Sequence, residues 1–224
     1  MIKTILGFLI KILLSAIADI KLYGTENMPQ GGFILATNHL GRLDAALIFY
    51  IFNKQDLILP IAEKYEHHPI FGPLGRGVGG IWLDRFNADI RSIREIMRRL
   101  RAGGILFIAP EGTRSKTGAL QQGKPGASFL ASKAGVPIVV AALTGTEDRR
   151  VVDNLKHFRR SHIVGRASKP FNLPPLDKGM PHEQALQQET DEIMCRIAAL
   201  LPENYRGVYA DNPRVKELVE ENYA

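Results

Sequence analysis

The chain has very little cysteine and no uninterrupted apolar segment of membrane-spanning length, and these absences exclude several classes of protein. Cys195 is the only cysteine among 224 residues, so no intrachain disulfide can form and a cysteine-based metal site is excluded. No Gly-x-Ser-x-Gly elbow is present, and the glycine-rich stretch 75–80 lacks the lysine and the spacing of a nucleotide-binding P-loop. There is no internal repeat, low-complexity tract or domain linker, so the length fits one α/β domain.

The charge is unbalanced towards basic residues. The formal net charge is +6 and the isoelectric point is about 9.5. Such a balance favours an anionic partner, which could be a phosphorylated substrate, an anionic lipid or a nucleic acid. Nucleic acid is disfavoured because tyrosine and phenylalanine are not interleaved with the basic residues as stacking platforms.

Residues 1–20 have the pattern of a membrane-associated amphipathic helix. A narrow polar stripe in this segment consists of Lys3, Gly7, Lys11 and Ser15. A membrane span needs about 20 predominantly apolar residues, and Lys11 near the middle of this shorter run would cost about 2.5–3.5 kcal/mol. We therefore expect the helix to lie in the plane of the membrane surface, with residues 21–224 forming the folded domain. Two alternatives stay open: a signal peptide, since Ala16-Ile17-Ala18 resembles a cleavage site, and a helix packed on the domain's own core.

Apolar strands alternate with helical segments over the rest of the chain. The expected strands are residues 33–37, 57–62, 81–83, 104–109, 138–143 and a more polar edge strand at 161–173. The expected helices run from Asp44 to near Asn53, then over 88–102, 127–134 and 181–201, with a short one from Pro213. This alternation predicts a single three-layer α/β domain with a mostly parallel sheet flanked by helices.

A polar turn, Asn38-His39 with Asp44 five residues after the histidine, follows the strand at 33–37. Such a turn lies at the carboxyl end of a sheet, where open α/β folds build their sites. On one regular helix His39 and Asp44 would point about 140° apart. If His39 lies on the turn and Asp44 in the first turn of the helix, the two side chains converge, and the aspartate orients a general base. The alternative is a turn histidine beside an ordinary helix-capping aspartate.

Two further strand ends carry polar turns, Asp84-Arg85 and Glu111-Gly112-Thr113-Arg114-Ser115. In a parallel sheet such ends share one edge, so the turns can line a single crevice. Arg85 and Arg114 suit a phosphate because a planar guanidinium presents paired donors, although each alone could be a surface ion pair. His67 and His68 have no matching ligand spacing, so no metal site is expected.

These turns resemble the sequence blocks of the glycerolipid acyltransferase family that includes the 1-acylglycerol-3-phosphate acyltransferases. The blocks are Asn38-His39-x4-Asp44, Gly80-Ile81-Trp82-Leu83-Asp84-Arg85, Pro110 to Ser115 and Val136-Pro137-Ile138. They stand in the family's order and cover about residues 20–145. The second block matches if Gly79 takes the first glycine position.

The resemblance implies transfer of a fatty acyl group from acyl-CoA or acyl-carrier protein to the hydroxyl of a lysophospholipid, most simply 1-acylglycerol 3-phosphate. His39 would be the general base and Asp44 its orienting partner. The acceptor phosphate would meet Arg85 and Arg114, with Glu111, Gly112 and Thr113 shaping the pocket and Lys64 as a weaker phosphate ligand. No metal or other cofactor is expected, and the helix at the amino terminus would place the enzyme at the cytoplasmic membrane face as a peripheral or monotopic protein.

Gly41 and Arg42 depart from the family pattern, which usually has serine and an aromatic residue at these positions, and Ala109 replaces a common phenylalanine. These changes alter the pocket wall, so another lysophospholipid, a glycolipid or an aminolipid stays open as the acceptor. A non-catalytic module that binds anionic membranes is the alternative from another class.

Overall fold

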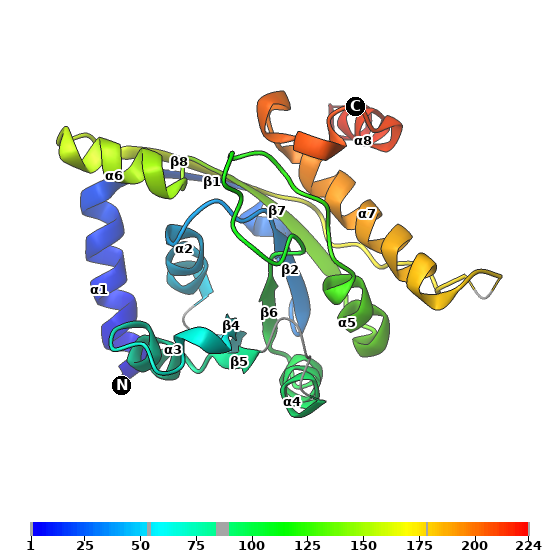
Figure 1. The fold of residues 1–224 in the computed structure, drawn as a ribbon, viewed down its shortest axis with the longest axis horizontal. Helices are drawn as coiled ribbons and strands as arrows, with labels where there is room; N and C mark the ends of the chain where they lie inside the picture. The colour runs from blue at the N-terminus through cyan, green and yellow to red at the C-terminus, as the bar shows by residue number, and fades with distance from the viewer. Residues whose placement is uncertain (1, 53–54, 84–89, 178, 224) are drawn as a thin grey trace.

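The computed structural model describes residues 2–52, 55–83, 90–177 and 179–223, and a six-stranded sheet lies at its centre (Figure 1). The strands, in their order across the sheet, are β1 (Ala18–Tyr23), β8 (Ser161–Ala167), β7 (Ile138–Thr144), β2 (Phe33–Thr37), β6 (Ile105–Ile108) and β3 (Leu57–Ile58). Every neighbouring pair is parallel except β7 and β8, which are antiparallel. The prediction of a mostly parallel sheet is confirmed.

Helices cover both faces of the sheet (Figure 1). On one face lie α1 (Ile2–Ile17), α2 (Leu43–Phe52) and α3 (Phe71–Val78); on the other lie α4 (Ile90–Arg101), α5 (Gly126–Ala134), α7 (His182–Leu200) and α8 (Pro213–Tyr223). Because successive strand residues point to opposite faces, Phe33 and Leu35 of β2 enter the first core, whereas Ile34 and Ala36 enter the second. A strand buried on both sides needs the continuous apolar run seen in the sequence.

The expected strand at 57–62 is divided between two sheets. After β3, the segment β4 (Pro60–Ala62) leaves the main sheet and pairs in parallel with β5 (Ile81–Leu83). Pro60 has no N–H to donate, so it lacks one hydrogen bond of the ladder at the point where the chain leaves β6. The strand that precedes the Asp84-Arg85 turn therefore belongs to the small second sheet, and not to the edge shared by β2 and β6.

Three other elements differ from the sequence-based expectations. The first helix ends at Ile17 because residues 18–20 already belong to β1, which pairs with β8. β8 therefore lies inside the sheet and ends at Ala167, while β1 forms the edge. Helix α6 (Asp148–Lys156) was not expected at all. The remaining short elements are the 3-10 helices η1 (Thr25–Asn27), η2 (Glu63–Tyr65), η3 (Glu203–Tyr205) and η4 (Gly207–Tyr209).

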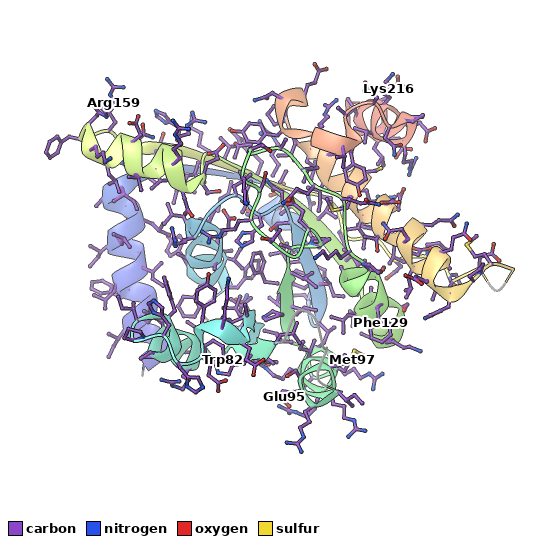
Figure 2. All side chains as sticks on the ribbon, viewed as in Figure 1. Trp82, Glu95, Met97, Phe129, Arg159 and Lys216 are labelled. Atoms are coloured by element: carbon purple, nitrogen blue, oxygen red, sulfur yellow. The ribbon has the colours of Figure 1, made fainter. Side chains whose placement is uncertain are left out.

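Cys195 lies within α7, where only 2 % of its surface is exposed. Burial raises the pKa of its thiol to about 11. The residue packs in the core on the α7 face of the sheet. Figure 2 shows the side chains that fill the space between this helix layer and the sheet.

None of the helices in the described residues combines the length and the apolar character that crossing a bilayer requires.

Candidate active site

The turn that carries His39 is attached to the neighbouring strand by the side chain of Asn38. The Nδ2 of Asn38 donates to the Leu143 carbonyl at 2.8 Å, and the Leu143 N–H donates to Asn38 Oδ1 at 2.7 Å. Both bonds are buried, and they continue the hydrogen bonding between β2 and β7 beyond the end of β2. The chain is therefore held firmly one residue before His39.

His39 and Asp44 meet, with Nδ1 of the histidine 2.7 Å from Oδ2 of the aspartate. Asp44 lies in the first turn of α2 and is fully buried. The same Oδ2 accepts hydrogen bonds from the N–H groups of Leu40 at 2.8 Å and Gly41 at 3.0 Å. Because this oxygen accepts at every contact, Nδ1 is the donor, and in the neutral imidazole the lone pair is then on Nε2. The side chains thus converge from turn and helix, which is one of the two arrangements that the spacing left open.

The side chain of Glu111 binds the backbone of the His39 turn. Its Oε1 accepts the His39 N–H at 2.9 Å, and its Oε2 accepts the backbone N–H of Gln121 at 3.0 Å and its side-chain amide at 3.3 Å. Burial raises the pKa of the Glu111 carboxyl, against the opposing effect of these hydrogen bonds. The carboxylate is directed into the protein, so Glu111 shapes the site by joining the two turns and does not offer itself to a phosphate.

Two cavities lie beside these turns. An apolar one of about 310 Å³ reaches from His39 and Gly112 down to the small sheet, α4 and α5. Its deeper lining includes Ile61, Leu83, Ile96, Phe107, Phe129 and Leu130. A polar one of about 1140 Å³ is lined by Leu40, Thr113, Arg114 and the start of α6. In each turn, consecutive residues thus face different cavities: His39 and Gly112 line the apolar one, and Leu40 and Thr113 line the polar one.

Gly112 has φ of +69°, in the left-handed region that favours glycine. A Cβ there would lie 3.2 Å from the Lys124 side chain. Glycine therefore lets this turn pass close to the Lys124 side chain.

Arg114 points into the polar cavity and forms an ion pair with Asp148, the first residue of α6. The carboxylate of Asp148 also accepts two bonds from Arg42, from its backbone N–H at 2.8 Å and from its Nη1 at 3.1 Å. One carboxylate thus holds two guanidinium groups next to the His39 turn. Such a pair of cations presents the donors that a phosphate requires.

Gly41 makes this arrangement possible. A Cβ at Gly41 would lie 1.9 Å from the Thr146 carbonyl oxygen and 3.1 Å from Asp148 Oδ1. The segment between β7 and α6 therefore rests directly on the backbone of the His39 turn. Glycine at position 41, where the family usually has serine, is matched to this close approach.

One predicted phosphate ligand, Lys64, is not part of this arrangement, and another falls outside the described residues. Lys64 lies exposed in η2, with its Nζ 5.2 Å from the centre of the Tyr65 ring, and it lines neither cavity. Arg85, with Asp84, lies outside the described residues, so its predicted role stays a prediction. Within the described part of the chain, no group of three histidine, cysteine or carboxylate side chains is placed to hold a metal ion.

Sequence reasoning missed Asp148 and Gln121. Gly145-Thr146 followed by apolar residues at 151 and 155 is typical of a helix start, and this pattern could have indicated α6. Nothing in the local sequence indicates that its first residue binds Arg42 across 106 positions. The local sequence likewise does not indicate the contact of Gln121 with Glu111, which forms because residues 109–125 fold back on themselves.

Comparison with known proteins matches the chain to a described family. A family model named Acyltransferase matches residues 19–144. A 1-acyl-sn-glycerol-3-phosphate acyltransferase of Bacillus subtilis (strain 168) is 27% identical over 195 residues, which cover 85% of this chain and 96% of that protein. The coconut (Cocos nucifera) protein of the same name is 37% identical over 116 residues, 50% of this chain and 37% of its own length.

The yeast (Saccharomyces cerevisiae) protein with that name is 27% identical over 168 residues, and the aligned part covers 54% of it. This chain thus spans only about a third to a half of the coconut and yeast relatives. Among solved structures, the 1-acyl-sn-glycerophosphate (LPA) acyltransferase PlsC from Thermotoga maritima superposes with a TM-score of 0.62 at 24% identity, covering 85% of this chain and 76% of that one. At this identity the likeness concerns the fold.

Proposed function

This chain belongs to the Acyltransferase family, and from that premise we propose that it transfers a fatty acyl group from a thioester donor to the free hydroxyl of 1-acylglycerol 3-phosphate. The observation that carries the proposal is the contact of His39 with the buried Asp44, at a turn where His39 lines the apolar cavity and the next residue, Leu40, lines the cationic one. The relatives named as 1-acyl-sn-glycerol-3-phosphate acyltransferases support this acceptor. The donor would be acyl-CoA or an acyl-carrier protein.

His39 would act through Nε2, because Nδ1 is engaged by Asp44. Nε2 takes the proton of the acceptor hydroxyl as its oxygen attacks the thioester carbonyl carbon. Asp44 stabilises the imidazolium that forms and keeps the ring in its orientation. When the C–S bond breaks, the leaving thiolate receives that proton from His39, and the ester product and a free thiol remain. No residue of the protein is acylated in this route, which fits the absence of a serine elbow.

The two cavities would divide the substrates between them. The apolar cavity beside His39 would hold an acyl chain, since burying each methylene contributes about 0.8 kcal/mol. The acceptor phosphate would lie in the polar cavity and bind Arg114, with Arg42 as a second cation. The phosphate would compete with Asp148 for these guanidinium groups. Arg85, which lies outside the described residues, stays a predicted third ligand of this phosphate.

Release of free thiol from acyl-CoA, or from an acyl-carrier protein, by the purified chain tests the activity directly. We expect release only when 1-acylglycerol 3-phosphate is present. Monoacylglycerol, which lacks the phosphate, should react about 100-fold more slowly, as expected for the loss of charge-assisted hydrogen bonds. Equal rates with the two acceptors would contradict the cationic phosphate site. No acceptor-dependent release from either donor, with a panel that includes other lysophospholipids, would favour the non-catalytic alternative.

We also propose that α1 attaches the protein to the cytoplasmic face of the membrane. One side of α1 packs on α2 and the domain core, with Leu14 buried among the residues it contacts. The opposite side is apolar as well, and its members are each at least 50% exposed: Ile5, Phe8, Leu9, Ile12 and Leu13. An exposed apolar stripe next to Lys11 suits a helix lying in the headgroup region of a bilayer.

Replacing Phe8 and Leu9 together with serine should weaken binding to anionic phospholipid vesicles at least tenfold, because both side chains would lose apolar burial. Vesicle sedimentation measures this. Substitution is preferable to deletion of the helix, since deletion would also remove Leu14 from the core. The matched control is Val208→Ser, at an exposed apolar position in η4 far along the chain. Unchanged sedimentation of the Phe8 and Leu9 variant would contradict attachment through α1.

A further inference from the structure

The turn between α6 and β8 exposes a large aromatic side chain. Phe158 is 99% exposed. It also has φ of +53°, and it is the one non-glycine residue in the described part of the chain with a positive φ. A left-handed phenylalanine is disfavoured sterically, and its ring in water is disfavoured by hydration. The backbone cost is partly offset, because Phe158 is the left-handed residue of the cap that ends α6: its N–H donates to the Leu155 carbonyl at 3.1 Å, and the Arg159 N–H donates to the Asn154 carbonyl at 2.8 Å. A glycine would serve this cap, so the cap does not account for the exposed ring.

This turn is fixed to the carboxyl end of α1. Ser161, which opens β8, is paired with Ala18, the first residue after α1. The guanidinium of Arg160 donates to the Ala18 carbonyl oxygen. Figure 2 labels Arg159 at the end of α6, on the same edge of the molecule as α1. The turn and the exposed face of α1 therefore belong to one rigid edge of the sheet.

Phe158 also ends an apolar stripe along α6. Val152 and Leu155 precede it at intervals of three residues, and they are 49% and 45% exposed. Val152 lines the polar cavity that contains Arg114. The stripe thus extends from the wall of that cavity to the edge of the molecule where α1 lies.

The charges around this stripe are mainly positive. Lys156, Arg159 and Arg160 are exposed next to Phe158. The neighbouring carboxylates are Asp153, 3.7 Å from His157, and Asp19, 3.4 Å from His162. Arginine and lysine beside an exposed aromatic ring match a membrane surface, where the ring can enter the apolar interior while the cations bind anionic headgroups. That combination describes the headgroup region of an anionic bilayer.

We propose that Phe158 inserts into an anionic lipid bilayer as a second membrane contact, which together with α1 holds the polar cavity at the membrane surface. The proposal rests on membrane attachment through α1. With two contacts at one edge the protein cannot rotate freely about α1. The α6 stripe then provides an apolar path from the bilayer to the cavity for a lipid acceptor.

A single tryptophan at position 158 reports the insertion directly. In a Trp82→Phe background, Phe158→Trp should show blue-shifted emission and loss of iodide quenching when vesicles of phosphatidylglycerol mixed with phosphatidylcholine are added. Val208→Trp in the same background, on the η4 surface, should remain quenched. Circular dichroism checks that both variants fold. On the wild-type background, Phe158→Ser should bind these vesicles about tenfold more weakly, in keeping with the loss of one buried aromatic side chain.

A protein that sediments with the vesicles while the tryptophan at position 158 remains in water would overturn the proposal. So would an absence of binding to anionic vesicles, or equal binding by the Phe158→Ser variant and the wild type. Neither measurement uses an acyl donor. Insertion without any acyl transfer would therefore count against the proposed reaction and leave this membrane contact standing.

Discussion

Replacing His39 with alanine is expected to reduce kcat/KM for acyl transfer roughly 1,000-fold, within the range observed for a lost general base. The expected change in stability is small. The two backbone bonds of the turn, from the His39 N–H to Glu111 and from the Ser115 N–H to the His39 carbonyl, are kept. Asp44 also keeps the Leu40 and Gly41 donors. Thiol release under second-order conditions and a thermal melt measure the two quantities.

The matched control for this experiment is His67→Ala, because His67 is an exposed histidine that lines neither cavity. It should retain wild-type activity. If His39→Ala kept more than a tenth of the wild-type rate, the assignment of His39 as the base would be wrong. A His39 variant that melted at a much lower temperature would show that the side chain serves the fold.

Replacing Gly41 with serine, the residue that the family usually carries there, is expected to destabilise this protein by about 3 kcal/mol. The Cβ would enter the space of the Thr146 carbonyl, at 1.9 Å, and backbone atoms cannot rotate away as a side chain can. The segment before α6 would have to move, and the bonds from Asp148 to Arg42 and Arg114 would be disturbed. Urea unfolding and the KM for the acceptor should both change.

Gly126→Ala is the control for stability, because the nearest atom to a Cβ there is 4.0 Å away and the residue begins a helix. Alanine at that position should be neutral or slightly stabilising. If Gly41→Ser unfolded at the same urea concentration as the wild type, the close packing of the β7–α6 segment on the His39 turn would be contradicted.

The sequence predicted the central strands well, because a buried strand is marked by the apolar character of its own consecutive residues. The runs that became β2 and β6 are apolar on both faces, and only a strand covered on both sides needs such a run. The His39–Asp44 contact followed from placing one residue in a turn and the other in the first helical turn. Both inferences depend on residues within a few positions of each other.

The features that sequence did not predict depend on long-range contacts. The separation of β4 from β3 is determined by pairing with β5, about 20 residues later. The ion pairs of Asp148 join segments that no periodicity connects. For α1, the alternatives of a packed helix and a membrane-facing helix are not exclusive. Its inner side is packed in the core and its outer side is apolar and exposed, a distinction that a hydrophobic pattern alone cannot make.

Because its only cysteine is buried, the folded protein adds almost no background signal to an assay that detects free thiol with a disulfide reagent. With the Cys195 pKa at about 11 and the side chain enclosed in α7, the native chain presents almost no thiolate to a disulfide reagent near neutral pH. Reagent consumed during turnover therefore measures the released donor thiol and nothing from the enzyme. When the chain unfolds, Cys195 becomes accessible and consumes one equivalent of the reagent per molecule. The same assay therefore also reports unfolding of any variant under test.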